Sequence, residues 1–459
     1  MTCPQINLPK NRTITVLDEA DCCVVGGGVS GVAAAVAAAR GGAKTILIER
    51  GVALGGSQTL ALVEPWMPTF APESDTPWVK EVEARLRAEG CETADGTTDY
   101  VWTNPETLAF VYDSLTAETG VRVLYHAVLT EAVVRDGHVA AVLVQTIGGV
   151  FAVRARVFID ATGDALLARL AGVPAEAGYE KTGRNQPMSF RFEMGGVDLE
   201  RLARYIVEEL GDDWCKTRPP FFEIAEARHR DIQYKLEPFF VRGIETGELT
   251  EADAEYFQAF TVPGKPGVMS MNCPELPADR FSASDPLSYS EAVREGRASM
   301  RRVSRYLIRH MPGFEHAYIS REAAMLGARE SWRIVGRVRV TAEDYYARRR
   351  FPDAVARTAW YIDAHGEKVG DYLAAGEFYE IPYRAMVANE IENLIVTGRC
   401  ISVDFLTQAS MRIQRTCMSL GEAAGVAAAW CVAHGESPNA LAWEKLPKQA
   451  RSYVSADEG

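Results

Sequence analysis

Short apolar runs that end in glycine or in an acidic residue set the pattern of the first sixty residues. One run, at 22–25, ends in a glycine-rich turn and passes directly into an alanine-rich stretch. A second run, at 45–48, stops at Glu49. Continuous apolar runs on either side of a helical stretch are typical of parallel strands that are buried on both faces. The pattern predicts a β–α–β unit over residues 21–60.

Further along, the pattern changes to strands separated by tight turns. We expect a helix over 104–118, because Asn-Pro-Glu at its start supplies a cap and a first turn, and then a strand at 121–125. An Asp-Gly pair and a Gly-Gly pair then separate alternating apolar runs, as in β-hairpins. These runs lie at 129–135, 139–146 and 151–158. They predict an antiparallel meander that returns to the main sheet near Asp160.

From about residue 171 the stretches become longer and richer in proline and aromatic residues. The longest predicted helix starts at Asp285 as the N-cap, with proline next in the first turn, and runs to about residue 309. A strand-like stretch lies at 189–194, and residues 218–261 carry no readable motif. We therefore expect an inserted α+β domain over 171–388, between two parts of a first domain at 1–170 and 389–459.

Composition limits the classes of partner. The chain has 459 residues, 47% hydrophobic and 24% charged, so it can bury a large core in about two domains. A formal charge of −13 argues against binding to nucleic acid or to an anionic membrane. We read neither a membrane span nor a signal peptide, and the nine scattered cysteines suit a reducing cytoplasm. No cluster has metal-ligand spacing.

The first β–α–β unit carries the residues for binding a dinucleotide. Gly26 permits the tight turn, Gly28 lets the backbone approach a pyrophosphate, and Gly31 lets the helix pack close to the strand. The helix N-terminus then faces the phosphates. Glu49 ends the second strand, where a carboxylate can accept both ribose hydroxyls. Because strand, glycines, helix, strand and acid occur in order, a bound dinucleotide is favoured over an ordinary glycine turn.

Three other segments resemble a known class of flavoproteins. They are Gly55-Gly56-Ser57, Asp160-Ala161-Thr162-Gly163-Asp164 and Thr397-Gly398-Arg399. With the N-terminal fingerprint, they resemble the FAD-dependent oxidoreductases of the glutathione-reductase-like, two-dinucleotide-binding-domain type. The resemblance extends to a poorly characterised branch, the FAD-dependent oxidoreductase family, through Gln186-Pro187-Met188-Ser189, Arg329-Glu330-Ser331, Ile362-Asp363-Ala364-His365, Ile381-Pro382-Tyr383-Arg384 and Ser410-Met411-Arg412.

This resemblance implies a fold class and a cofactor. The implied class is α/β: a glutathione-reductase-like FAD-binding Rossmann domain with a β-meander and an inserted α+β substrate domain. The implied cofactor is non-covalent FAD. The residues expected to bind it are Gly26, Gly28, Ser30, Gly31, Glu49, Arg50, Gly55, Gly56, Ser57, Val128, Ala161, Thr162, Gly163, Gly398, Arg399, Met411 and Arg412. The chain departs from the family pattern at Trp332, where we expect a basic residue, and at Phe405 and Gln408.

His365 is the sharpest catalytic candidate. It follows Asp363 in a polar segment, and an imidazole can take a proton from a hydroxyl or amine while flavin N5 takes the hydride. The alternative is a loop histidine that only bonds to backbone.

Several arginines lie in or beside the family-like strings. We expect Arg384 and Arg329 to hold a substrate carboxylate, with Arg333 a weaker candidate, because a guanidinium binds a carboxylate through two parallel bonds. For Arg384 the alternative is pairing with a protein carboxylate such as Glu380. Arg412 precedes the last long helix, where its charge and the helix dipole would stabilise the anionic reduced flavin at N1–C2=O.

Together these features predict a cytoplasmic FAD-dependent dehydrogenase or reductase. It would transfer a hydride between flavin N5 and a small polar, anionic metabolite, at a C–OH, C–N or CH–CH bond. An NAD(P)-linked reductase is the rival enzyme, disfavoured because only one complete glycine fingerprint is present. A flavin-binding partner protein without catalysis is the rival outside enzymes. The sequence does not identify the electron acceptor or the oligomeric state.

Overall fold

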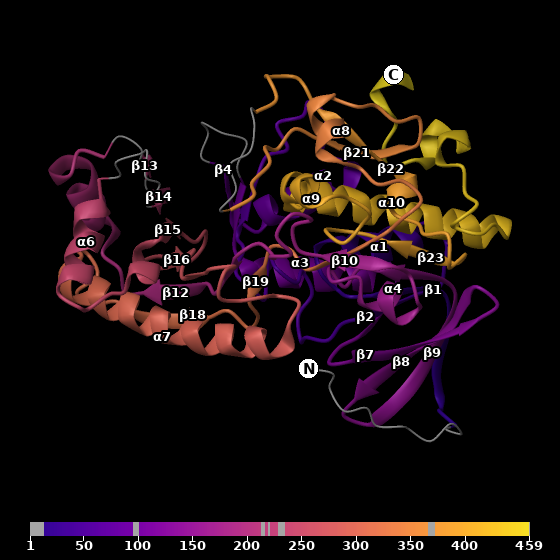
Figure 1. Ribbon diagram of the computed structural model, residues 1–459, viewed down its shortest axis with the longest axis horizontal. Helices are drawn as coiled ribbons and strands as arrows, with labels where there is room; N and C mark the ends of the chain where they lie inside the picture. The colour runs from indigo at the N-terminus through magenta and orange to yellow at the C-terminus, as the bar shows by residue number, and fades with distance from the viewer. Residues whose placement is uncertain are drawn as a thin grey trace.

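The computed structural model describes residues 13–94, 101–212, 216–218, 221–227, 235–365 and 372–458, and Figure 1 shows the arrangement of their helices and strands. The largest sheet has the strand order β6-β2-β1-β9-β8-β7, and β23 pairs with β9. Its strands are β1 (Val16–Val25), β2 (Thr45–Ile48), β6 (Arg122–Leu124), β7 (Val128–Arg135), β8 (His138–Thr146), β9 (Gly149–Asp160) and β23 (Leu394–Val396).

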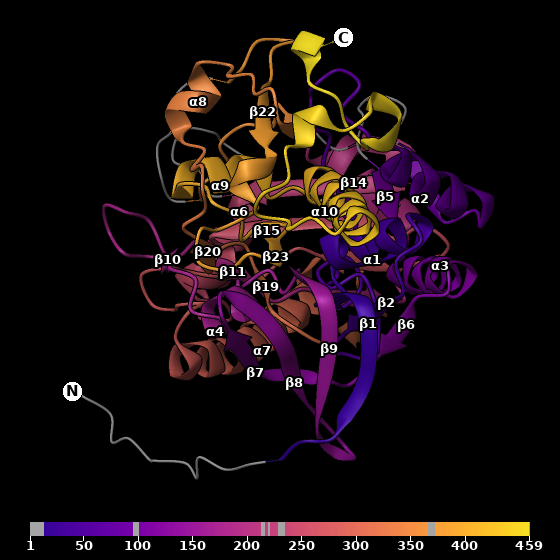
Figure 2. The ribbon, with the colours of Figure 1, turned by 90° about the vertical axis from the view of Figure 1, so that its right-hand side faces the viewer.

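The sheet combines a parallel half and an antiparallel half. β1 pairs in parallel with β2 and β9, whereas β7, β8 and β9 form an antiparallel meander. β9 is long enough to belong to both halves, and Figure 2 shows it between β1 and β8. The predicted β–α–β unit and meander are therefore confirmed. Because β1, β2, β9 and β23 run in parallel, their carboxyl ends meet at one edge, where ligands bind in such sheets.

Two helices on this sheet are in backbone contact. α1 (Val29–Arg40) packs along α10 (Gln414–His434). A Cβ at Gly421 would lie 2.1 Å from the Ser30 carbonyl oxygen, and one at Gly425 would lie 2.2 Å from that of Ala34. Only glycine permits this approach. By length and composition α10 is long and apolar enough to cross a membrane, and 72% of its most apolar stretch is buried inside the molecule.

Buried apolar residues of β1, α1 and α10 form the first hydrophobic core, and a second core lies beside it. It surrounds a sheet of order β13-β14-β15-β16-β12-β18, covered by α6 (Glu237–Glu245) and α7 (Pro286–His310) at the left of Figure 1. The strands are β12 (Phe192–Gly195), β13 (Lys216–Arg218), β14 (Phe221–Ala227), β15 (Tyr256–Thr261), β16 (Met269–Met271) and β18 (Tyr318–Glu322). The Asp285 carboxylate accepts from the Ser288 N–H at 2.7 Å, which confirms the predicted start of α7.

The predicted strand at 189–194 is split in two. β11 (Met188–Ser189) pairs with β17 (Glu275–Leu276) and β19 (Gly327–Ala328), whereas β12 pairs with β16 and β18. The chain changes sheets at 190–191, which periodicity alone did not indicate. The other elements are β3 (Pro65–Trp66), β4 (Glu92–Ala94), β5 (Val101–Thr103), β10 (Ala175–Ala177), α2 (Pro77–Ala88), α3 (Pro105–Glu118), α4 (Leu166–Leu170), α5 (Leu199–Arg204) and α9 (Phe405–Met411).

The chain returns to the first core well before residue 388. After β20 (Trp332–Ile334), the buried side chains of Val340, Tyr345, Ile381 and Met386 all belong to that core. α8 (Ala342–Tyr346), β21 (Ala354–Thr358) and β22 (Tyr379–Pro382) lie over α9 and α10 in Figure 1. The last residue packed in the second core is Ala328, whereas the stretch 340–387 contributes side chains to the first core. The expected domain boundaries at 171 and 388 remain a prediction.

Candidate functional site

The glycine turn after β1 is closed by backbone on two sides. Gly26 has a φ of +101°, and a Cβ there would lie 2.5 Å from the Ala161 carbonyl oxygen. A Cβ on Gly31 would lie 1.8 Å from the carbonyl oxygen of Gly26. No side chain fits at either position, so the turn and the start of α1 are held against the end of β9.

Glu49 lies at the end of β2, as expected, and is 5% exposed. Its Oε2 accepts from the Gly27 N–H at 2.7 Å and its Oε1 from the Gly51 N–H at 2.6 Å. Each carboxylate oxygen keeps lone-pair capacity for a ribose hydroxyl. The Ala127 N–H donates to the Glu49 carbonyl, which places the half-exposed Val128 beside it. Arg50 is exposed next to Glu49.

A second glycine segment closes over the first. The Gly55 N–H donates to the Gly27 carbonyl at 2.8 Å, and Gly28 and Gly55 form a parallel bridge. A Cβ on Gly56, whose φ is +53°, would lie 2.9 Å from the Gly28 Cα. Two side-chain-free backbones thus face each other in front of the α1 N-terminus, and this cradle fits the pyrophosphate of a dinucleotide. Ser57 follows and is partly exposed.

The second motif contacts the C-terminal glycine segment. The fully buried Asp160 accepts from the N–H groups of Thr162 and Ala168, and burial raises the pKa of its carboxyl. Asp164 pairs with Arg399 at 2.7 Å, and a Cβ on Gly163 would lie 3.1 Å from the Arg399 Nε. The segments at 160–164 and 397–399 therefore form one wall of the site.

The side chains of two residues expected to bind the cofactor make contacts inside the protein instead. The Ser30 hydroxyl donates to the Cys417 carbonyl at 2.8 Å, against the Gly398 backbone. Met411 is fully buried in the first core.

Beyond this wall, charged and polar side chains from both cores gather into what we call the junction cluster. Its members are Tyr256, Glu275, Arg329, Asp363, His365 and Arg412. His365 lies between two carboxylates, with Nδ1 3.0 Å from Glu275 and Nε2 3.4 Å from Asp363. Its ring also contacts that of Tyr256, with centroids 5.8 Å apart.

Arginines complete the junction cluster. Arg329 lies 3.2 Å from Glu275 and donates to the Pro187 carbonyl at 2.7 Å. Arg412 pairs with Asp363 at 2.9 Å. Burial opposes ionisation of Asp363, but the charges of Arg412 and His365 hold the pKa of its carboxyl below the usual value. Burial in turn lowers the pKa of Arg412, against the attraction of Asp363. The structure thus brings together three residues of the sequence prediction: His365, Arg329 and Arg412.

Arg384 does not join them. Its guanidinium binds both oxygens of Asp353, at 2.9 Å each, and its backbone N–H donates to the same carboxylate. The structure therefore favours the alternative of pairing with a protein carboxylate, and corrects the partner. Glu380 is fully buried and instead accepts from Tyr453, Ser455 and the Ala456 N–H.

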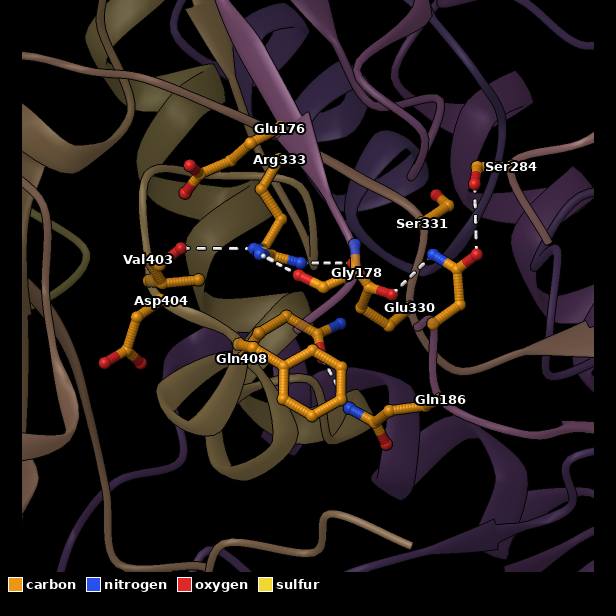
Figure 3. A network of polar contacts seen from close by, with 12 residues as sticks. Glu176, Gly178, Gln186, Ser284, Glu330, Ser331, Arg333, Val403, Asp404 and Gln408 are labelled. Carbon is orange, nitrogen blue, oxygen red and sulfur yellow. Dashed lines mark hydrogen bonds and ion pairs between the residues drawn. The ribbon is translucent and has the colours of Figure 1, made fainter. Parts of the chain in front are cut away.

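Arg333 is also held internally, in the network of Figure 3. It pairs with Glu330, donates to the Gly178 carbonyl at 3.0 Å and to that of Val403 at 3.2 Å, and is 1% exposed. Gln408 accepts from Gln186 at 2.9 Å and donates to the Arg329 carbonyl. This network fixes the backbone from which Arg329 reaches the junction cluster.

The departures from the family pattern have structural partners. The Arg169 guanidinium lies 3.9 Å from the ring centroid of Trp332. Phe405 stacks on Tyr179, with centroids 4.8 Å apart. Neither residue contacts the junction cluster in these pairings.

Sequence reasoning missed Tyr256 and Glu275. Tyr256 falls in the segment 218–261, of which 219–220 and 228–234 lie outside the described residues, and no motif surrounds it. Glu275 lies on the short strand β17, without a glycine or proline signature that indicates a site. Only the fold brings both to His365.

The sequence profile described as FAD dependent oxidoreductase matches residues 21–449. No curated protein sequence matches this chain. Among solved structures, a geranylgeranyl bacteriochlorophyll reductase-like protein from Thermoplasma acidophilum is 13% identical, with a TM-score of 0.46 over 91% of this chain and 80% of that one.

Two further structures are similar at the same level. The flavin-dependent brominase Bmp2 is 15% identical, with a TM-score of 0.47 over 94% of this chain and 82% of that one. The p-nitrophenol 4-monooxygenase of Pseudomonas putida is 12% identical, with a TM-score of 0.47 over 92% and 81%. The profile match spans nearly the whole chain and agrees with the glycine cradle, so FAD is the cofactor. The protein is an enzyme, and it belongs to the family of FAD-dependent oxidoreductases.

Proposed function

We propose that this enzyme transfers a hydride between flavin N5 and a small polar, anionic metabolite, with His365 as the proton carrier. The observation that carries the proposal is the position of His365 between Glu275 and Asp363, in contact with Tyr256. A proton carrier needs an oriented ring and charges that balance the proton it takes up, and this arrangement supplies both.

The two ring nitrogens of His365 have different surroundings. Glu275 lies 3.0 Å from Nδ1 as an ion-pair partner, and this negative charge favours a proton on Nδ1. Nε2 is farther from Asp363 and is then the nitrogen that accepts a proton from a substrate hydroxyl or amine. Bound FAD supplies the hydride acceptor or donor. Arg412, held by Asp363, brings a positive charge to the segment expected to face the flavin pyrimidine.

Arg329 supports an anionic substrate better than Arg384. Its side chain is 10% exposed and lies in the junction cluster, whereas that of Arg384 is 44% exposed and saturated by Asp353. We accordingly withdraw the role of holding the substrate anion from Arg384 and place the anion on the side of the site where Arg329 lies.

Other features of the proposal rest on the chain itself. The meander within the Rossmann sheet supports the glutathione-reductase-like type of FAD domain. Residues 57–62 contain no histidine or cysteine for a covalent flavin link, which favours non-covalent FAD. We propose a cytoplasmic enzyme that acts on a small molecule, without nucleic acid or membrane partners, and that passes electrons to an acceptor not yet identified.

Anaerobic reduction of the flavin tests this function. The purified yellow protein is mixed with pools of carboxylate-bearing metabolites, and loss of the oxidised flavin absorbance is followed. We expect one pool to bleach wild-type protein rapidly and His365→Ala only slowly. If NADH or NADPH alone bleaches the flavin and no metabolite does, the nicotinamide-linked reductase replaces this proposal.

A further inference from the structure

Arg191 is a buried arginine without a carboxylate partner. It is 5% exposed, and its Nη1 donates to the Leu62 carbonyl at 3.1 Å. Among the described residues, no carboxylate oxygen lies within ion-pairing distance of its guanidinium. Burial lowers the pKa of this guanidinium to about 10, so it is still charged at neutral pH. A buried charge is costly unless it is paired, and a neutral donor would serve Leu62 equally well.

Glu64, which is 1% exposed, is the carboxylate whose charge acts most strongly on Arg191. Neither of its carboxyl oxygens has a hydrogen-bond partner among the described residues. Burial, together with the charge of Glu193, raises the pKa of Glu64 to about 8, against the opposing charges of Arg191 and Lys265. Glu64 therefore keeps its proton at neutral pH and provides no counter-charge for Arg191, whose guanidinium also lies 5.7 Å from the ring centroid of Phe260.

The other acid nearby is already neutralised. Lys265 binds both oxygens of Glu193 at 2.9 Å. The arginines of the junction cluster are balanced too, because Arg329 pairs with Glu275 and Arg412 with Asp363. Arg191 thus carries the surplus positive charge of this region, which suits a monoanion better than a doubly charged phosphate.

The position of Arg191 relates it to the proposed chemistry. The charges of both Arg191 and Arg329 act on the Tyr256 hydroxyl, and the Tyr256 ring contacts His365. The Tyr256 hydroxyl itself is positioned by Asn272, which donates to it at 3.2 Å. An anion bound to Arg191 would therefore lie in the region of Tyr256, whose ring contacts His365.

We propose that Arg191 is the anchor for the substrate carboxylate, and that the buried Glu64, two residues after the Leu62 carbonyl that holds Arg191, competes with the substrate for this anchor. The role of Arg191 as a substrate anchor rests on the proposed function, whereas the binding of an anion to Arg191 does not depend on it. A guanidinium forms two parallel bonds to a carboxylate, which fixes the direction of the bound molecule. The protonated form of Glu64 keeps the anchor open, and its anion competes for Arg191.

Acetate is the probe, and acetamide is its neutral counterpart. Binding to the FAD-loaded protein is measured by saturation-transfer NMR on the methyl protons, a method suited to the roughly millimolar affinity expected of so small a ligand. Arg191→Met should raise the acetate dissociation constant about tenfold or more, because a charged hydrogen bond to a buried anion is lost. Arg305→Met is the matched control, since Arg305 is an exposed cation on α7.

A pH series tests Glu64 without altering Arg191. Between about pH 7 and about pH 9, wild-type affinity for acetate should fall about tenfold as Glu64 ionises. Glu64→Gln, which stays neutral, should bind acetate equally at both values. This variant keeps the inference testable if Arg191→Met fails to fold.

Three results would overturn the inference: equal acetate binding by wild type and Arg191→Met, equal binding of acetamide and acetate, or tighter binding of inorganic phosphate. The outcome is separable from that of the proposed function. Arg191-dependent acetate binding in a protein whose flavin no metabolite bleaches would sustain the anchor and reject the hydride transfer. Bleaching by a metabolite without Arg191-dependent binding would do the reverse.

Discussion

The cradle for the ADP half of FAD and the junction cluster are assembled differently. The cradle comes from residues 26–56, and its working parts are backbone N–H groups, missing side chains and one carboxylate. The junction cluster takes its side chains from short segments between Tyr256 and Arg412, on both hydrophobic cores. The cradle is determined by local sequence, whereas the cluster exists only when the two cores are folded together.

This difference separates binding of the cofactor from chemistry. A contiguous cradle can form once its own β–α–β unit is folded, so changes there should act on FAD occupancy first. A cluster built across two cores depends on each contributing segment, so changes there should alter rate, anion binding or stability and leave FAD bound.

Reversing the charge of Glu49 should have the largest effect. Glu49→Arg removes the acceptor for the N–H groups of Gly27 and Gly51 and puts a cation where ribose hydroxyls need an acceptor. We expect the variant to purify with little or no flavin, measured as the ratio of flavin to protein absorbance. Glu19→Arg is the control, because Glu19 lies on the surface, where it pairs with Arg154. Full flavin content in Glu49→Arg would break the comparison.

Removing the imidazole of His365 should leave FAD bound and slow its reduction. The expected loss in the single-turnover rate is about 10²–10⁴-fold, the usual contribution of a positioned proton carrier. Stopped-flow absorbance with the metabolite found by screening gives the rate. His138→Ala serves as the control, since His138 is exposed on the meander. An unchanged rate in His365→Ala would return this residue to a structural role.

The same comparison explains what the sequence could and could not predict. The turn at Gly26, the carboxylate of Glu49 and the meander follow from residues adjacent in the chain, and each was predicted at its observed place. His365 was found because it belongs to a family-like string. Tyr256 and Glu275 were not, because their roles depend on how β15 and β17 pack against a loop about 100 residues away in sequence.

Arginines show the limit most clearly. Nothing in the sequence distinguishes Arg384, whose guanidinium Asp353 occupies, from Arg191, which has no such partner. Charge and sequence neighbourhood are alike, and only burial and the position of carboxylates separate them. The same holds for the domain boundary, since the apolar residues at 340–387 do not themselves indicate which core they enter.

Breaking the buried ion pair between Arg333 and Glu330 (Figure 3) should lower the free energy of unfolding more than the two substitutions that follow. Arg333→Met leaves Glu330, which is fully buried, without its ion-pair partner. We expect a loss of about 3–5 kcal/mol in the free energy of unfolding. The double variant Glu330→Gln/Arg333→Met should recover part of it, because no uncompensated charge remains. Urea denaturation of the three proteins measures both effects, and a double variant as unstable as the single one would contradict this account.

The ionisation of Glu64 should make stability depend on pH. The folded protein holds the pKa of Glu64 at about 8, above that of the unfolded chain, so the folded state binds this proton more tightly. Wild type should therefore lose stability as pH rises from the unfolded value towards about 8, and Glu64→Gln should not. We expect the variant to gain about 1–3 kcal/mol relative to wild type between about pH 5 and about pH 8. Thermal denaturation at the two pH values gives the difference. Because each protein is compared with itself, any difference in packing between the amide and the carboxyl group cancels.

Arg384 should give the smallest effect, and it sharpens the comparison with Arg191. Arg384→Met removes two bonds to Asp353, but the Arg384 side chain is 44% exposed and the carboxylate keeps a bond from its backbone N–H. Solvent screening reduces the value of such a pair, so we expect a loss of about 1 kcal/mol or less. The KM for the substrate and the acetate dissociation constant should be unchanged, because the guanidinium serves Asp353 and not the junction cluster. A tenfold rise in either constant for Arg384→Met, with Arg191→Met unaffected, would exchange the roles assigned to the two arginines.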